Sequence, residues 1–235
     1  ETLKKFVAAP EELDIENSPF AASRQISIAG KTVTAFRISY VGEQGWELHM
    51  RYEDGLAVWD ALRGIGVMAV GVETYANSRR LEKSLRLQNA DLHTQYNLIE
   101  AALARPKVKE ADFRGKAKHV EYRERDHQPA MLCTLVMTDN IDANGVARYP
   151  VGNLPVMDPD TGKTLIDELG RRSYTTSIAF GPSIGKNIAL AYLPWDYCQE
   201  GRKLTVSYFD EIYPVEVVGI GYKPLYDPEN LKPRS

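Results

Sequence analysis

Residues 26–51, ISIAGKTVTAFRISYVGEQGWELHMR, carry the clearest structural signal in this chain of 235 residues. Apolar and polar side chains alternate on either side of Ala29-Gly30, which predicts two antiparallel strands joined by a tight turn. Residues 46–51 continue as a further strand. The connection at residues 38–45 holds a tyrosine, a carboxylate and two glycines. The segment is therefore either a plain hairpin with its turn residues or a hairpin whose connection forms the wall of a ligand site.

Two helices are expected after this hairpin. Asp54 is a suitable N-cap for the first, which the following glycines would end. The second is expected from Glu73 to Leu85, with Arg79 and Glu82 spaced for an i,i+3 ion pair. A short helix should follow the basic stretch near residues 100–112.

The second half of the sequence is dominated by strand signals. Turn clusters such as FGPSIGK separate them, and because this one leads into a strand, we interpret it as a turn and not as an anion site. Many short strands with turns between them predict a small antiparallel barrel or sandwich. We place a domain boundary near residue 104, with an α+β portion at 1–104 and a β-rich domain at 105–235. The expected strands are residues 130–137, 173–180, 187–194 and 203–218.

Composition limits the classes of partner. A net charge of −3 and a pI near 5.9 give no electrostatic reason to expect nucleic acid or an anionic membrane. No apolar run approaches the roughly 20 residues of a membrane helix. Cys133 and Cys198 lie outside any CxxC motif, so we expect reduced thiols in a cytoplasmic protein. The histidines show no ligand spacing, so no metal site is expected.

Glu43 and Glu47 are the candidate ligand-binding carboxylates, beside Tyr40. One carboxylate can accept the adjacent N–H and NH₂ donors of a pterin or a related heterocycle. Charge-assisted bonds of this kind contribute about 1.5–3 kcal/mol each. The alternative is that both acids are solvent-facing turn residues.

Trp46 and Arg80 each have two interpretations. Trp46 either stacks on a flat ligand or fills the core beneath the hairpin. Arg80 either binds a ligand carboxylate or pairs with Glu73 or Glu82 on its own helix.

Four segments together resemble one family, the folate-dependent aminomethyltransferase superfamily typified by the T-protein of glycine cleavage. Longer stretches, among them ALAYLPWDYCQEGR, are most similar to the tetrahydrofolate-dependent vanillate and syringate O-demethylases of lignin-aromatic catabolism. The four segments are YVGEQGWEL, SRRLEKSLRLQNADL, KEADFRGKAKHVEY and TTSIAFGPSIGKNIALAYLP.

The resemblance implies a three-domain cloverleaf fold with tetrahydrofolate at its centre. This chain matches only the second part of the folate-binding domain, followed by the C-terminal antiparallel β-barrel. The matching N-terminal half, with the remaining catalytic residues, is therefore expected elsewhere, either in the same protein or on a second chain.

The resemblance also implies roles for individual residues. Glu47 matches the glutamate that binds the pterin edge, and Tyr40 matches a tyrosine lining the folate site. Arg80 matches the RLEK arginine near the folate. Glu43 falls on a family acidic position, and Trp46 stands where the family often has Phe, so we count both among the candidate cofactor-binding residues. Tyr40 is in addition the candidate catalytic residue, because a phenol with a pKa near 10 can protonate a departing phenolate of similar basicity.

The function that this resemblance implies is methyl transfer from a methoxylated aromatic acid, of vanillate or syringate type, to N5 of tetrahydrofolate. An alternative is an aminomethyltransferase, or the folate domain of a dimethylglycine or sarcosine oxidising enzyme. Tyr75-Ala76-Asn77 stands where the T-protein has ARD, which weakens the case for glycine cleavage. A non-catalytic folate-binding module ranks last, because neither cysteine lies in a reactive motif.

Overall fold

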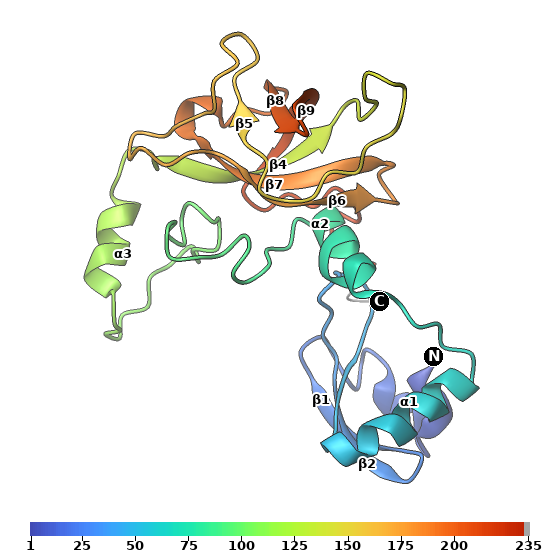
Figure 1. Ribbon diagram of the computed structural model, residues 1–235. Coiled ribbons are helices and arrows are strands. Elements are labelled where there is room, and N and C mark those ends of the chain that lie inside the picture. The colour runs from blue at the N-terminus through green and yellow to red at the C-terminus, as the bar shows by residue number, and fades with distance from the viewer. Residues whose placement is uncertain (233–235) are drawn as a thin grey trace. The chain divides into compact units, whose positions relative to one another are not determined.

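The structure is a computed structural model that describes residues 1–232 (Figure 1). Its internal contacts divide the chain into two compact units. Among the described residues, the N-terminal unit comprises residues 1–76 and 227–232, and the barrel unit comprises residues 77–226. The division between the units thus falls at residues 76–77, ahead of the domain boundary expected near residue 104. That domain boundary remains a prediction.

The N-terminal unit is built on a three-stranded antiparallel sheet, β1-β2-β3. The predicted hairpin is confirmed: Ile28 pairs with Lys31 across a turn at Ala29-Gly30. Both turn residues have left-handed φ angles, 51° and 72°, as a two-residue hairpin turn of the primed type requires. The strands are β1 (Ser23–Ile28), β2 (Lys31–Phe36) and β3 (Glu47–His49).

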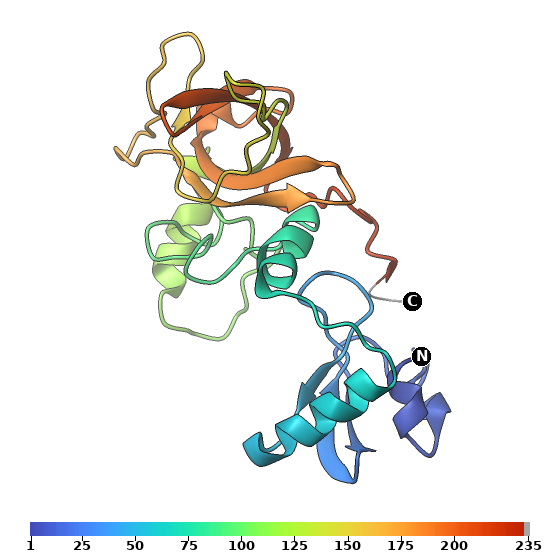
Figure 2. The same ribbon diagram turned by 45° about the vertical axis from the view of Figure 1, so that its right-hand side comes forward.

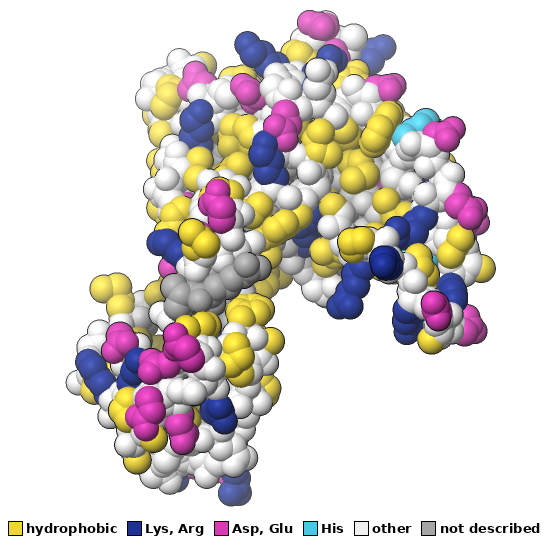
Figure 3. Space-filling model, turned by 180° about the vertical axis from the view of Figure 1, so that it is seen from behind, with side chains coloured by type: hydrophobic (Ala, Val, Ile, Leu, Met, Phe, Trp, Pro, Cys, Tyr) yellow, Lys and Arg dark blue, Asp and Glu magenta, His cyan; other side chains and the backbone are white. Residues whose placement is uncertain are grey.

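A single α-helix, α1 (Gly55–Gly64), packs against this sheet through Val58. Asp54 precedes the helix as predicted, but its side chain makes no capping hydrogen bond. It binds Lys31 instead, with 2.9 Å between the carboxylate and Nζ. Short 3₁₀ turns lie beside the sheet and the helix: η1 (Leu3–Phe6), η2 (Pro10–Leu13) and η3 (Tyr52–Asp54). Acidic side chains gather on the face of this unit seen in Figure 3.

The helix expected from Glu73 to Leu85 is shorter and irregular. A π-helical turn, η4 (Thr74–Arg79), runs into α2 (Arg80–Glu82). The chain then leaves the helix at Ser84, whose φ is 55°. The Leu85 N–H donates to the Arg80 carbonyl and the Ser84 N–H to the Leu81 carbonyl. This is the Schellman arrangement, with a serine in the left-handed position that glycine usually takes.

The barrel unit contains a six-stranded antiparallel sheet in the order β5-β8-β9-β4-β7-β6, curled on itself (Figure 2). The predicted strand at 203–218 is in fact a hairpin, because Phe209 and Asp210 adopt left-handed φ angles of 50° and 62° and turn the chain. The short helix α3 (Lys116–Arg123) precedes the sheet as expected. The strands are β4 (Ala130–Met137), β5 (Val156–Met157), β6 (Thr175–Gly181), β7 (Lys186–Pro194), β8 (Lys203–Tyr208) and β9 (Glu211–Ile220), with the 3₁₀ turn η5 (Trp195–Tyr197) after β7.

Strand β4 is buried on both faces, which explains why seven of its eight residues are apolar. The exception, Thr134, shares a hydrogen bond with the Ser84 hydroxyl. Cys133 and Leu135 face the barrel interior together with Val206. Leu132 faces a second cluster that includes Leu81 of α2. Among residues 1–232, no helix is long and apolar enough to cross a membrane.

Candidate functional site

The connection between β2 and β3 brings Tyr40 against Tyr75, with ring centroids 5.5 Å apart. The backbone N–H of Tyr40 donates to the Tyr75 hydroxyl. Burial, and then the negative charge of Glu47, raise the pKa of Tyr75. These three residues, the Tyr40–Glu47–Tyr75 cluster, all belong to the N-terminal unit. The cluster combines two phenols with a carboxylate.

Glycine and serine shape the connection that carries Tyr40. Gly42 has a φ of 69°, which a residue with a Cβ adopts at a cost. The Ser39 hydroxyl accepts the Glu43 N–H at 3.0 Å, closing the turn. Glu43 itself has one carboxylate oxygen, Oε1, enclosed by the protein. The backbone of Glu43 therefore belongs to the turn, and its carboxylate is partly enclosed. A ligand-binding role for Glu43 remains a prediction.

Glu47 is the first residue of β3 and pairs with Phe36. Its side chain is 42% exposed, and its Oε2 lies 3.3 Å from Nε2 of His49. The His49 side chain is 59% exposed, so this pair is open to solvent and not sealed in the core. The carboxylate can therefore be reached by a ligand, and its negative charge acts on the Tyr75 phenol.

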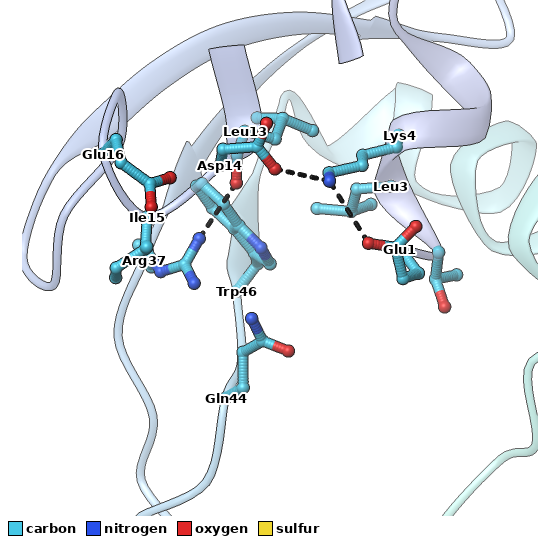
Figure 4. A pocket seen from close by; sticks show the side chains of 11 residues that line it. Glu1, Leu3, Lys4, Leu13, Asp14, Ile15, Glu16, Arg37, Gln44 and Trp46 are labelled. Atoms are coloured by element: carbon cyan, nitrogen blue, oxygen red, sulfur yellow. Dashed lines mark hydrogen bonds and ion pairs between the residues drawn. The ribbon is translucent and has the colours of Figure 1, made fainter. Parts of the chain in front are cut away.

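Trp46 has the surroundings of a packing residue. It contacts the hydrophobic core of the N-terminal unit, and the Arg37 guanidinium lies 5.3 Å from its ring centroid. Trp46 and Arg37 line a cavity of about 470 Å³ (Figure 4), whose lining includes neither Glu47 nor Tyr40. Stacking of Trp46 on a ligand held by Glu47 remains a prediction that this geometry does not favour.

Arg80 is fully buried in the barrel unit. Its Nη1 donates to Asp91 at 2.6 Å, and its Nη2 donates to the Ser177 hydroxyl. Asp91 also accepts hydrogen bonds from Thr176 and from the Leu87 N–H. These contacts tie α2 and the segment after it to strand β6. A direct contact between Arg80 and a cofactor stays a prediction, while the observed contacts are structural.

The predicted ion pair between Arg79 and Glu82 is present, with 2.9 Å between Nη1 and Oε2. Glu82 also accepts the backbone N–H of Ser183 in the connection between β6 and β7. That connection, FGPSIGK, is a turn, as predicted. Because the Glu82 carboxylate already accepts one of the backbone N–H groups of this turn, the turn serves a structural contact.

A second cavity, of about 450 Å³, lies in the barrel unit beside Tyr96 and Tyr192. Their rings stack with centroids 3.6 Å apart, and Arg171 covers the other face of Tyr96 at 4.3 Å. The Arg171 guanidinium is in turn bound by Glu100 and Asp167. Sequence reasoning missed this layered cluster, since its members are far apart in the chain.

The half-buried ring of Tyr96 in this layered cluster leads us to predict a loss of stability at alkaline pH. Burial raises the pKa of Tyr96 to about 12, so the folded state holds that proton more tightly than the unfolded state. The contribution is complete below the ordinary tyrosine pKa of about 10 and is lost as pH rises toward 12. We expect the free energy of unfolding to fall less steeply across this pH window in Tyr96→Phe than in the wild type. Chemical denaturation at each pH would measure the difference. Parallel curves for the variant and the wild type would contradict this assignment.

Tyr75 is the residue of the Tyr40–Glu47–Tyr75 cluster that sequence reasoning missed. The available signal was the replacement of ARD by Tyr75-Ala76-Asn77, which was interpreted only as a departure from the T-protein pattern. The structure shows what the departure supplies, a second aromatic ring beside Tyr40.

Comparison with known protein families agrees with this architecture. The model of the GCVT N-terminal domain matches residues 1–108, and the model of the glycine cleavage T-protein C-terminal barrel domain matches residues 151–227. The chain is a member of the T-protein-like superfamily. The predicted fold class, a folate-domain portion followed by an antiparallel barrel, is thereby confirmed.

Two groups of relatives of this T-protein-like chain share most of its length. Human mitochondrial dimethylglycine dehydrogenase is 31% identical over 214 residues, which cover 88% of this chain and 23% of that protein. The aminomethyltransferase of Exiguobacterium sibiricum is 31% identical over 84% of this chain and 52% of its own length. The crystal structure of aminomethyltransferase T from Bartonella henselae has the same fold, with a TM-score of 0.69 at 21% identity, over 88% of this chain and 53% of that one. The chain thus spans about half the length of its aminomethyltransferase relatives, and less of the dehydrogenase.

Proposed function

We propose that this chain is the folate-binding and barrel portion of a tetrahydrofolate-dependent enzyme that transfers one-carbon units. The observation that carries the proposal is the match of both T-protein domain models, in order, along a single chain. The names of the relatives, aminomethyltransferase and dimethylglycine dehydrogenase, support amine compounds as the donors.

Bound tetrahydrofolate would supply a nucleophilic nitrogen, N5, that accepts the one-carbon unit. The residues of the Tyr40–Glu47–Tyr75 cluster suit a pterin ring chemically. A partly exposed carboxylate at Glu47 offers two acceptor oxygens side by side, and the pterin edge offers two adjacent donors. Glu47 would thereby fix the orientation of the ring, which is how an enzyme raises the effective concentration of a reacting atom.

A methoxylated aromatic acid is the second candidate donor, and one observation favours it. The phenols of Tyr40 and Tyr75 lie side by side, with an N–H of one residue bound to the hydroxyl of the other. A phenol next to the leaving oxygen can protonate a departing phenolate at little thermodynamic cost. The similar basicity of the tyrosine phenol and the departing phenolate is what favours this donor.

The missing half of the fold follows from the same proposal. The chain spans 52% of the aminomethyltransferase from Exiguobacterium sibiricum. We infer that a complementary folate-domain segment, from the same protein or from a second chain, completes the catalytic unit.

A donor comparison tests the proposed function. The protein that contains this chain, with its complementary segment, would be assayed for transfer to tetrahydrofolate from dimethylglycine, from the glycine cleavage reaction and from vanillate or syringate. Transfer from an amine donor supports the first candidate, and transfer from vanillate or syringate supports the second. A protein that neither binds tetrahydrofolate in a direct titration nor transfers from any donor would overturn the proposal.

Tyr40→Phe separates the two donor classes. If the phenol protonates a leaving phenolate, the variant should lower kcat for a methoxylated aromatic by about 100-fold or more. Tetrahydrofolate affinity should change by less than about fivefold, the size of one neutral hydrogen bond. Tyr52→Phe is the matched control, because Tyr52 lies in the same unit and is fully solvent-exposed. Unchanged turnover in the Tyr40 variant would remove this tyrosine from the mechanism.

A further inference from the structure

The two cysteines of the sequence meet in the barrel unit. Cys133 lies in strand β4, and Cys198 follows the 3₁₀ turn η5. They are 65 residues apart, yet their sulfur atoms lie 3.8 Å from each other. No bond joins the two sulfurs in this structure. Their proximity was not expected, because neither belongs to a CxxC motif.

The two thiols differ in exposure and in freedom to move. Cys133 is fully buried in the interior cluster of the barrel, on a strand that β7 and β9 pair on both sides. Cys198 is half-buried and lies outside the helices and strands, in the segment between η5 and β8. Movement that brings the sulfurs together therefore falls to Cys198, while Cys133 is a fixed target.

The hydrogen bond between the sulfurs also divides their roles. Cys133 donates its S–H to Cys198, and this bond, together with burial, holds the pKa of Cys133 well above its usual value. Accepting the same bond lowers the pKa of Cys198. The thiolate, which is the nucleophile, therefore forms on the sulfur that solvent can reach. As a thiol, Cys198 has the carbonyls of Leu193 and Pro194 as acceptors at 3.3 Å.

We propose that Cys133 and Cys198 form a reversible disulfide when the protein meets a peroxide, so that the barrel unit carries a redox modification site. The sulfurs must approach from 3.8 Å to the bonding distance of about 2 Å. That shift is small enough for a change of side-chain torsion at Cys198 with adjustment of its turn. The strand pairing of β4 need not break.

The reaction has two steps, with hydrogen peroxide as the oxidant. The Cys198 thiolate attacks one peroxide oxygen, the O–O bond breaks, and the departing hydroxide takes a proton to become water, leaving Cys198 as a sulfenic acid. The Cys133 sulfur then attacks the Cys198 sulfur. The S–O bond breaks, and hydroxide leaves with the Cys133 proton as a second water. Two thiols and one peroxide thus give one disulfide and two waters.

The bond would close a long loop inside the barrel unit. This loop contains β5, β6 and β7, so the disulfide would join the middle of β4 to the chain entering β8. Cross-linking residues that are distant in sequence restricts the unfolded chain most. The oxidised protein is expected to unfold at a temperature higher by about 5 °C, since a domain of this size shifts by a few degrees per kcal/mol.

The test starts from the protein with both thiols reduced and adds an equimolar amount of hydrogen peroxide. The expected product has lost both titratable thiols together and about 2 Da in intact mass, the two hydrogens of a disulfide. Peptide mapping should recover the Cys133 and Cys198 peptides as one cross-linked species. Dithiothreitol should restore the thiols, the mass and the original unfolding temperature.

Two variants distinguish a pair from independent thiols. In Cys133→Ala, a second equivalent of peroxide should carry Cys198 from sulfenic to sulfinic acid, and no intramolecular bond should form. In Cys198→Ala, the buried Cys133 should react far more slowly than either wild-type thiol. If a variant fails to fold, the wild-type mapping decides alone. Sulfinic acid at Cys198 with Cys133 still free, disulfide-linked dimers as the main product, or two unreacted thiols would each overturn the proposal.

Discussion

Arg80→Met is expected to lower the free energy of unfolding of the barrel unit by about 3–5 kcal/mol, the cost of breaking a buried ion pair by removing one partner. The variant leaves the buried Asp91 carboxylate without its guanidinium. It also removes the donor to the Ser177 hydroxyl. Chemical denaturation monitored by circular dichroism would give the change. A variant as stable as the wild type, but with weak tetrahydrofolate binding, would return Arg80 to the role that the family resemblance implied.

Two further variants identify the cause of that loss. Arg80→Met combined with Asp91→Asn should recover part of the stability, because the second change removes the uncompensated charge while keeping an acceptor oxygen. Lys118→Met is the surface control. Lys118 also pairs with a carboxylate, that of Glu121, but both side chains are exposed. Its replacement should change stability by less than about 1 kcal/mol.

The same ion pair shows where sequence reasoning stops. The candidate partners of Arg80 were Glu73 and Glu82, because a local sequence pattern reveals only residues of the same expected helix. Arg80 does have local acceptors, Asn77 and the Leu85 carbonyl. Its ion-pair partner Asp91, however, is 11 residues away, and the Ser177 hydroxyl is 97 residues away. Contacts of this kind depend on how β6 packs against α2, and a local pattern does not contain that information.

Local rules succeeded where local chemistry decides the conformation. Ala29-Gly30 with alternating flanks predicted the β1–β2 hairpin, including its turn. Local rules predicted less well where a tertiary contact competes with the local interaction. Asp54 is a good N-cap by type, but Lys31 on β2 takes its carboxylate. Likewise, the helix expected to reach Leu85 ends early, because Ser84 adopts a backbone conformation that its residue type does not signal.

For the candidate site, the residues nearest the hairpin were predictable and their neighbours were not. Tyr40 and Glu47 stood out because their motif resembles a family segment. Tyr75 lies 35 residues beyond Tyr40 in sequence, and only the fold shows that their rings meet. Sequence reasoning therefore found two of the three residues of the cluster, and the structure supplied the third, the aromatic ring of Tyr75.

Glu47→Gln is expected to weaken tetrahydrofolate binding by about 10- to 100-fold, which corresponds to the loss of one charge-assisted hydrogen bond of about 1.5–3 kcal/mol. The amide keeps the size of the side chain, but it replaces one acceptor oxygen with an NH₂ donor. That donor would face a donor of the pterin edge. Direct titration of the cofactor by calorimetry would measure the change, with the unfolding midpoint as a check on folding.

Glu53→Gln is the matched control for this experiment, since Glu53 lies in the same unit and its exposed carboxylate pairs with the exposed Arg51 at 2.8 Å. It removes the same charge from the N-terminal unit without touching the Tyr40–Glu47–Tyr75 cluster. If both variants weaken binding equally, the effect is one of net charge and screening. If Glu47→Gln binds tetrahydrofolate as tightly as the wild type does, Glu47 is not a pterin contact. Only a loss confined to Glu47→Gln makes the carboxylate a specific ligand of the ring, because its two oxygens act through geometry and not through charge alone.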